Sequence, residues 1–129
     1  AESAHPASVV LAREPPGVPG KWELVGYSHL VNGDVPDAVS GHRPIELKRL
    51  YVARAWHGRR VAQALMDATM AAAVERGALT LWLGVWERNT RAVAFYAKYG
   101  FTRVGEHTFV LGADAQTDWL LSRPIGPEQ

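Results

Sequence analysis

The sequence predicts a single α/β domain over residues 1–129, in which two helices pack on a mixed sheet. Two observations predict it. The middle of the chain runs strand, helix, strand, and a crossover of that length joins parallel strands with a right-handed connection. Strand pairs typical of hairpins lie before and after this unit and add antiparallel neighbours. A length of 129 residues with 47% hydrophobic residues suits one domain with one core.

Three strands are expected in the first half of the chain. Ser8–Ala12 is a short apolar, β-branched run, and a proline-glycine turn separates it from a second strand, Trp22–Val31. Gly26 marks a possible bulge in that second strand. A polar loop then leads to the third strand, Ile45–Val52, in which neither alternate set of side chains is cleanly polar. Both faces of this strand are therefore expected to be at least partly covered.

The first helix is expected over Gly58–Arg76. Its apolar face recurs at i, i+4, i+7 and i+11, in Val61, Leu65, Ala68 and Ala72. Its many alanines favour a helix and allow close approach to a sheet. Gly77 stands where a left-handed C-terminal cap belongs.

The second half is expected to add a strand, a helix and a final hairpin. Leu79–Val85 alternates cleanly between apolar and other residues, as a strand does. The last two strands are Phe101–Leu111 and Thr117–Ser122, separated by G-A-D-A-Q.

The second helix is expected over about Thr90–Tyr99, with Asn89 or Thr90 as its N-cap. The side chains expected to pack from it are Val93, Phe95, Ala97 and Tyr99.

Composition excludes several classes of function. With 14 basic and 13 acidic side chains, the net charge is too small to attract nucleic acid or a membrane surface, and the basic residues form no extended stripe. There are no cysteines, which excludes disulfides, thiolate metal sites and a cysteine nucleophile and makes the cytoplasm the simplest compartment. No apolar run approaches the ~20 residues of a membrane helix, and the first residues lack the apolar core of a signal peptide. The five histidines show no metal-binding spacing, so no metal is expected.

The stretch W-H-G-R-R-V-A, Trp56–Ala62, joins the third strand to the first helix. Amides at a helix N-terminus lack intrahelical partners and lie at the positive end of the helix dipole, so a phosphate fits there. Gly58 permits a tight turn, and His57, Arg59 and Arg60 add charge. A solvated cationic turn explains these local features equally well. A Walker-type phosphate loop is excluded, because no Gly-Lys-Ser/Thr is present.

From Ile45 to Ile125 the order of elements resembles the GNAT superfamily of acyl-CoA-dependent N-acyltransferases. In that family a Q/R-x-x-G-x-G/A turn and the following helix hold the coenzyme pyrophosphate. The last residue of the matching stretch, Ala62, fits this pattern. His57 stands where Gln or Arg is usual, and Arg60 stands where the first glycine is usual. The side chain of Arg60 must therefore point away from the phosphates or pair with them.

A second matching segment is W-E-R-N-T-R-A-V-A-F-Y-A-K-Y-G-F, Trp86–Phe101. By this resemblance, Asn89 bonds the pantetheine arm and Tyr96 lies near the thioester sulfur. The tail of the chain resembles a branch that includes polyamine acetyltransferases. The contacts that the resemblance implies for acetyl-CoA are Leu50, Tyr51, Val52, His57, Gly58, Arg59, Arg60, Val61, Ala62 and Asn89.

The resemblance also implies a difference at the N-terminus. The family usually begins with a strand and one or two helices, whereas only seven residues precede the strand at Ser8. We therefore expect a GNAT-like fold without those elements, with an open sheet edge and an open apolar face. A second copy of the chain, in a homodimer, is expected to cover them.

The activity implied is transfer of an acetyl group from acetyl-CoA to a primary amine, which is a small amine, a polyamine or a protein amine. Glu46 is the candidate base, acting through a water, with Glu87 in reserve; an ordinary strand-edge carboxylate is the alternative for Glu46. Backbone amides of Leu50–Val52 would bind the oxyanion if the two parallel strands splay apart. Tyr96 would protonate the leaving thiolate; the alternative is a buried core tyrosine. Direct attack in a ternary complex is expected, without metal.

A non-catalytic GNAT-like module that binds CoA or associates with a partner is the competing hypothesis. Arg60 and the short N-terminus favour it, whereas Ala62, Asn89 and Tyr96 favour the enzyme.

Overall fold

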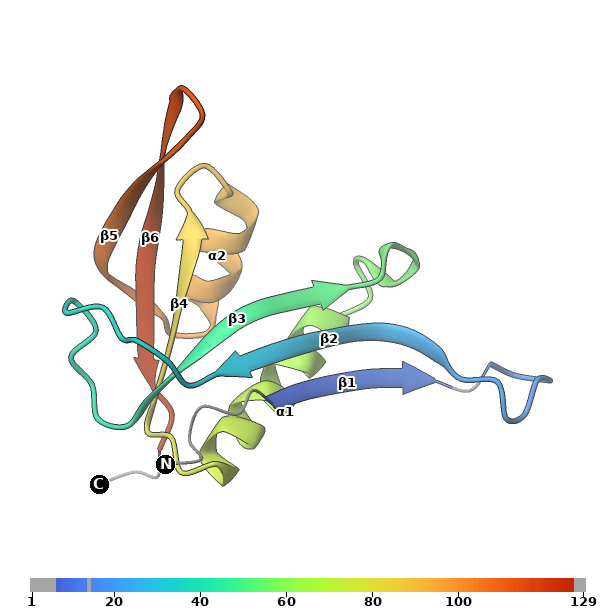
Figure 1. Ribbon diagram of the computed structural model, residues 1–129. Coiled ribbons are helices and arrows are strands. Elements are labelled where there is room, and N and C mark those ends of the chain that lie inside the picture. Colours follow the sequence, from blue (N-terminus) through green and yellow to red (C-terminus); the bar gives the residue numbers. More distant parts are fainter. Residues whose placement is uncertain (1–6, 14, 127–129) are drawn as a thin grey trace.

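The alternating apolar segments form a six-stranded sheet, and both helices pack on it through one core (Figure 1). The computed structural model describes residues 7–13 and 15–126. The strand order is β1-β2-β3-β4-β6-β5, and each neighbouring pair is antiparallel except β3 with β4. The elements are β1 (Ala7–Arg13), β2 (Glu23–Val31), β3 (Pro44–Val52), the short 3₁₀ helix η1 (Arg54–Trp56), α1 (Val61–Glu75), β4 (Thr80–Trp86), α2 (Thr90–Lys98), β5 (Thr102–Leu111) and β6 (Asp114–Pro124). The predicted mixed, mostly antiparallel α/β fold is confirmed.

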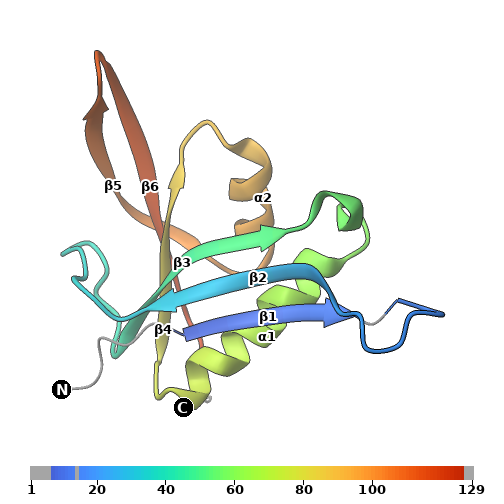
Figure 2. The ribbon, with the colours of Figure 1, turned by 45° about the vertical axis from the view of Figure 1, so that its right-hand side comes forward.

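The parallel strands β3 and β4 pair only at their beginnings. Their three paired positions end at Glu46 opposite Trp82. Beyond this point β3 stays with β2 as far as Val52, while β4 stays with β6 as far as Trp86. The sheet therefore divides into two halves that diverge, which Figures 1 and 2 show as β3 turning away from β4. The predicted splay of the parallel pair is confirmed.

A bulge in β3 explains why neither of its faces looked polar in the sequence. His29 pairs with Arg49 and Leu30 pairs with Leu47, so Lys48 has no opposite residue. An extra residue in one strand reverses which alternate side chains face the core. Leu47 is buried before the bulge, and Leu50 packs on the same core after it. A second bulge lies at Val25, next to the predicted Gly26.

The helix α1 lies across β1, β2 and β3 (Figure 2). Its buried residues are Leu65, Met66, Thr69 and Ala73. The predicted apolar face was therefore wrong: of its four residues only Leu65 is buried, and Val61, Ala68 and Ala72 lie half-buried beside the true face. The reason is a buried polar contact. The Thr69 hydroxyl donates to the Leu65 carbonyl at 2.6 Å, and the Ser28 hydroxyl must then donate to Thr69, also at 2.6 Å. Both hydroxyls are satisfied, so their burial carries no desolvation penalty from unpaired groups.

The second half of the chain departs from the prediction at two places. In α2, Ala97 is exposed, and the residues that pack on the core are Ala92, Val93, Phe95, Tyr96 and the adjoining Tyr99. In the hairpin, β5 and β6 continue to Leu111 and Asp114, so the predicted five-residue loop is wrong and only Gly112 and Ala113 connect the strands. Gly112 has a φ of 62°, a conformation that glycine adopts without strain and that a two-residue hairpin turn requires.

Candidate functional site

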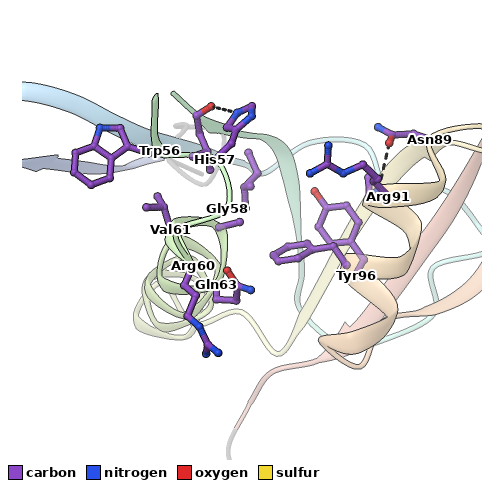
Figure 3. A pocket seen from close by; sticks show the side chains of 14 residues that line it. Trp56, His57, Gly58, Arg60, Val61, Gln63, Asn89, Arg91 and Tyr96 are labelled. Carbon is purple, nitrogen blue, oxygen red and sulfur yellow. Dashed lines mark hydrogen bonds between the residues drawn. The ribbon is translucent and has the colours of Figure 1, made fainter. Parts of the chain in front are cut away.

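A cavity of about 540 Å³ lies at the split in the sheet, between the start of α1 and the start of α2 (Figure 3). The end of β3 supplies one wall, the turn before α1 supplies the second, and α2 supplies the third. The lining residues are Leu50, Val52, Trp56, His57, Gly58, Arg60, Val61, Ala62, Gln63, Asn89, Arg91, Ala92, Phe95 and Tyr96.

Hydrogen bonds between residues 52 and 57 hold the turn before α1 against the end of β3. The amide of Trp56 donates to the Ala53 carbonyl at 2.8 Å, and the amide of His57 donates to the Arg54 carbonyl at 3.1 Å. The His57 ring donates from Nε2 to the Val52 carbonyl at 2.9 Å. The imidazole is therefore held against the strand, and the chain after it turns directly toward the cavity.

Arg60 is the N-cap of α1 and lies in the left-handed region, with φ 62° and ψ 17°. This conformation gives a physical reason for the glycine that is usual at this motif position, since a side chain there costs about 1–2 kcal/mol. It also explains why the predicted helix start at Gly58 is wrong, because Gly58 (φ 77°) and Arg60 both lie outside helical dihedrals. In Figure 3 the Arg60 guanidinium extends along α1, away from His57 and Asn89.

Three backbone amides at the start of α1 remain unpaired with any described residue. The first amide with a carbonyl partner is that of Ala64, which donates to Arg60 at 3.2 Å, and no side chain caps the helix. The amides of Val61, Ala62 and Gln63 thus face the cavity mouth at the positive end of the helix dipole. This arrangement suits an anionic group such as a diphosphate.

We expect Arg60→Gly to unfold at a higher temperature than Arg60→Ala. Both changes remove the guanidinium, but only glycine adopts the observed φ without strain, so the difference in stability is expected to be about 1 kcal/mol. For a chain of this length, this difference in stability corresponds to a difference in melting temperature of roughly 2–8 °C. Parallel thermal melts measure it, and an alanine variant that melts at or above the glycine variant would contradict the left-handed geometry.

On the α2 side, Asn89 caps the helix and keeps a free amide group. Its Oδ1 accepts from the Ala92 amide at 3.3 Å, so the side-chain NH₂ remains available to a ligand carbonyl. Tyr96 lies about two helical turns further along α2, and the centroid of its ring is 5.4 Å from that of Phe95 and 5.5 Å from that of Phe101. Burial raises the pKa of Tyr96 above its ordinary value, so its hydroxyl stays protonated at neutral pH. In Figure 3, Tyr96 and Arg91 reach from α2 toward the turn at His57.

The cavity contains every residue predicted from the sequence for the site except three. The Tyr51 ring lies 5.4 Å from that of Tyr27 and is exposed, so only its backbone borders the split. The Arg59 guanidinium lies 5.2 Å from the centroid of the Trp56 ring. Glu46 lines a different cavity, described below. Tyr99, expected to be a packing residue, donates its hydroxyl to the Gln63 carbonyl at 3.0 Å and joins the two helices.

Five lining residues were missed by the sequence-based prediction: Trp56, Gln63, Arg91, Ala92 and Phe95. Trp56 and Arg91 were present in the two quoted motifs, and their proximity to the other motif residues was the available signal. No local signal could have shown that Arg13, from β1, lies with its guanidinium 5.0 Å from the centroid of the Trp56 ring.

The second cavity, also about 540 Å³, lies on the opposite side of the sheet. Glu46 and Trp82, the last paired residues of the parallel strands, both line it. Ile45 and Leu47 are buried with the helices, so Glu46 between them points to the other face. Burial raises the pKa of Glu46 above its ordinary value, and the positive charge of Lys48 partly opposes the increase.

Residues 7–13 and 15–126 contain neither a cluster of metal-ligating side chains nor a membrane-spanning helix. No group of three or more His, Asp or Glu side chains in that part of the chain is arranged to hold a metal ion. None of the helices formed by these residues is both long and apolar enough to cross a bilayer.

The geometry defines an α/β protein with a split sheet, in which unpaired amides at a helix N-terminus border the gap and suit an anionic group. The model of the acetyltransferase (GNAT) family matches residues 3–101, and the chain belongs to this family.

Curated relatives of the chain are named N-acetyltransferases. It is 42% identical over 102 residues to an uncharacterized N-acetyltransferase of Mycobacterium tuberculosis, covering 79% of this chain and 61% of the relative. It is 37% identical over 103 residues to an uncharacterized N-acetyltransferase of Lactobacillus delbrueckii subsp. lactis, covering 80% of this chain and 60% of the relative. The chain thus spans about 60% of the length of these relatives.

Solved structures agree with the fold. Nourseothricin acetyltransferase superposes with a TM-score of 0.68 at 27% identity, over 92% of this chain and 65% of that one. The yncA protein of Salmonella typhimurium, solved with acetyl-CoA, gives a TM-score of 0.67 at 16% identity, over 83% of this chain and 61% of that one. The paiA N-acetyltransferase of Thermoplasma acidophilum, solved with coenzyme A, gives 0.58 at 21% identity, over 78% and 54% of the chains. The last two likenesses concern the fold alone.

Proposed function

We propose that this chain transfers an acetyl group from acetyl-CoA to a primary amine by direct attack in a ternary complex. The observation that carries the proposal is the divided sheet. The unpaired edge of β3 and the bare amides of α1 border one cavity with Asn89 and Tyr96. Diphosphate, amide and thioester groups would each meet suitable partners there.

The binding roles follow from the groups that remain free. The amides of Val61 and Ala62 would donate to the pyrophosphate, with positive charge supplied by Arg59 nearby. The backbone of Leu50–Val52 would pair with the pantetheine arm as an added strand, because β4 has left that edge of β3. On the opposite wall, the free NH₂ of Asn89 would donate to a pantetheine carbonyl.

The chemical roles divide between the two faces of the sheet. Glu46 would accept the proton of the acceptor ammonium through a water, and its raised pKa brings it closer to that task. Backbone amides of Leu50–Val52 would stabilise the oxyanion of the tetrahedral intermediate. Tyr96 would then donate its proton to the departing thiolate. Because low dielectric strengthens a thiolate as a base and also raises the pKa of the phenol, the proton affinities of the two groups increase together.

Thermal melting with acetyl-CoA tests the proposed function. At about 100 times its dissociation constant, one bound ligand adds about 2.7 kcal/mol of stability, which corresponds to a rise of roughly 10 °C. Acetylation is then followed by release of free thiol with a panel of amines. Absence of any thermal shift would refute acetyl-CoA as the co-substrate.

A non-catalytic CoA-binding or interaction module is the second candidate, because Arg60 occupies a position where the family pattern has glycine. The left-handed conformation of Arg60 and the outward course of its side chain reduce the weight of this departure. A full thermal shift with acetyl-CoA but no thiol release with any amine would favour the module.

We also infer a homodimer in the cytoplasm, as expected from the sequence. β1 is an edge strand, and Val10 and Tyr51 leave apolar surface exposed on the sheet face that α1 does not cover. A second copy would cover that edge and face. A monomeric mass in light scattering would refute the dimer.

A further inference from the structure

Two guanidinium groups from distant parts of the chain lie over the ring of Trp56, which lines the first cavity. The Cζ atom of Arg13 is 5.0 Å from the ring centroid, and the Cζ atom of Arg59 is 5.2 Å from it. Arg13 reaches this place from the end of β1, because β1 and β3 both pair with β2 and both end near its first residues. Each contact is favourable by itself, since the face of an indole attracts a cation.

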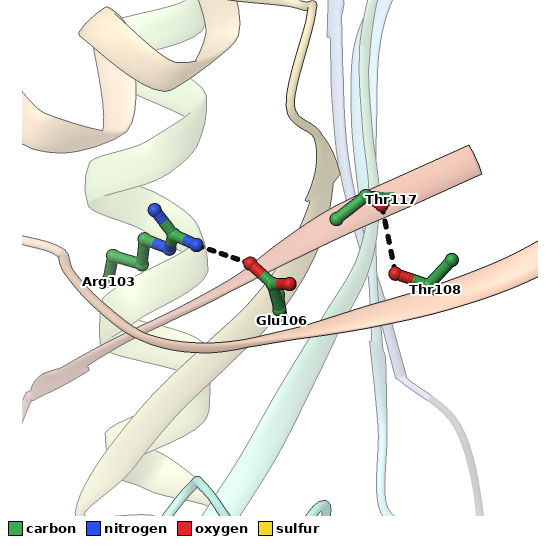
Figure 4. A network of polar contacts seen from close by, with 4 residues as sticks. All are labelled: Arg103, Glu106, Thr108 and Thr117. Carbon is green, nitrogen blue, oxygen red and sulfur yellow. Dashed lines mark hydrogen bonds and ion pairs between the residues drawn. The ribbon is translucent and has the colours of Figure 1, made fainter. Parts of the chain in front are cut away.

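Elsewhere in the described part of the chain, a guanidinium over an indole has a carboxylate of its own. The Cζ atom of Arg103 lies 4.3 Å from the centroid of the Trp119 ring, and Glu106 pairs with the same guanidinium (Figure 4). One cation and one anion balance each other at this contact, so it needs no ligand.

The contact at Trp56 lacks one negative charge by comparison. Glu23 pairs with Arg13, but no described carboxylate pairs with Arg59. The sequence also supplies no acidic residue from Val52 to Met66. Because both guanidinium groups lie over one ring, their positive charges repel each other at short range. An anion bound between them would replace this repulsion with two attractions.

Arg13 keeps the donors that such an anion requires. Its Nε lies 3.0 Å from Oε1 of Glu23, as an ion pair without hydrogen-bond alignment. The edge formed by Nη1 and Nη2 makes no hydrogen bond with a described residue, and this edge can bind two oxygens of one phosphate. Glu23 and the Trp56 ring already restrict the half-buried side chain, so little conformational freedom is lost on binding.

The two arginines lie at the end of the first cavity that suits phosphates. In Figure 3, Trp56 and Asn89 lie at opposite ends of the lining, with the start of α1 between them. The diphosphate of coenzyme A is proposed to bind the free amides of that helix. Coenzyme A carries its 5′-diphosphate and a 3′-phosphate on the same ribose, so the 3′-phosphate must lie within the width of one sugar from the diphosphate.

We propose that Arg13 and Arg59, held on the Trp56 ring, bind the 3′-phosphate of coenzyme A, so that the protein distinguishes acetyl-CoA from acetyl-3′-dephospho-CoA. The inference rests on the proposed function and specifies which form of the coenzyme the same site accepts. A phosphate monoester is mostly dianionic at neutral pH and offers three oxygens to the two guanidinium groups. Arg59 serves both the diphosphate and the 3′-phosphate, whereas Arg13 serves the 3′-phosphate alone.

A matched pair of ligands tests the proposal with the full chain. Calorimetry compares CoA with 3′-dephospho-CoA, which differ only in the phosphate monoester. We expect CoA to bind about tenfold more tightly, as suits charge-assisted hydrogen bonds at a partly exposed site. With the acetylated forms in the thiol-release assay, the same factor should appear in KM while kcat stays within about twofold, because the 3′-phosphate is remote from the thioester. Equal affinity for the two ligands would overturn the proposal.

Three variants locate the effect. Arg13→Gln is expected to reduce the preference for CoA to about twofold or less, while the affinity for 3′-dephospho-CoA stays unchanged and shows that the variant is folded. Arg54→Gln removes an equal charge from an exposed residue of η1 whose guanidinium does not lie over Trp56, so the preference should remain. Glu23→Gln breaks the ion pair but keeps the cation, so the preference should remain or increase. A preference that survives Arg13→Gln, or falls as far in either control, would overturn the assignment.

These measurements separate failure of this inference from failure of the proposed function. Equal binding of CoA and 3′-dephospho-CoA, with thiol release in the presence of an amine, would refute the subsite and support the transferase. A preference for CoA that depends on Arg13, without thiol release with any amine, would support the subsite and refute the transfer. Binding of neither ligand would refute both.

Discussion

Replacing Tyr96 with phenylalanine is expected to lower kcat by roughly a hundredfold or more, while the affinity for acetyl-CoA changes by less than about twofold. The ring would still fill its place between Phe95 and Phe101, because only the hydroxyl is removed. Loss of a proton donor to the thiolate affects the transition state and not the bound ground state, so the effect appears in kcat. Thiol release and calorimetry measure the two quantities.

Tyr99→Phe is the matched control for this change. Its hydroxyl donates to the Gln63 carbonyl and does not line the cavity, so we expect a stability loss of about 1 kcal/mol and little change in kcat. Equal kcat in Tyr96→Phe and wild type would remove Tyr96 from its proposed role. Because the folded-state pKa of Tyr96 is raised, its stabilising contribution is present at neutral pH and is lost only as the pH rises above 10.0.

Replacing Glu46 with glutamine is expected to lower kcat/KM by roughly a hundredfold at neutral pH, since the ammonium of the acceptor then loses its base. In the wild type, kcat/KM should fall on the acid side with an apparent pKa above the ordinary 4.5 of a glutamate, because burial disfavours the carboxylate. The glutamine variant should lose this acid limb. A variant that keeps both the rate and the limb would contradict the assignment.

The stability of the same variant should change in the opposite direction to its activity. A carboxyl whose folded pKa lies above its unfolded value stabilises the fold below the unfolded pKa and loses that contribution as the pH rises through the folded one. Glu46 is therefore a net cost at neutral pH, and Glu46→Gln should be at least as stable as the wild type there. The control is Glu87→Gln, because Glu87 is exposed and lines neither cavity, and we expect both its rate and its melting temperature to stay near those of the wild type.

The two halves of the candidate site differed in how far the sequence could predict them. His57–Ala62 and Asn89–Tyr96 are continuous segments whose chemistry depends on local features: a glycine turn, a helix start and an asparagine N-cap. The structure brings these segments to one cavity because each follows a strand of the parallel pair. Glu46 and Tyr96, expected in one site, lie instead in cavities on opposite faces of the sheet.

By itself the sequence determined the order of strands and helices, the Asn89 cap of α2 and the glycine turn before α1, because hydrophobic periodicity and backbone preference act over a few neighbouring residues. The tertiary structure alone decided where β3 leaves β4, that the bulge at Lys48 reverses the faces of β3, and that Asp37, Glu46 and Asp118 surround one cavity. These features depend on pairing between residues far apart in the chain, and a one-residue shift in register, which no local pattern records, changes every face that follows it.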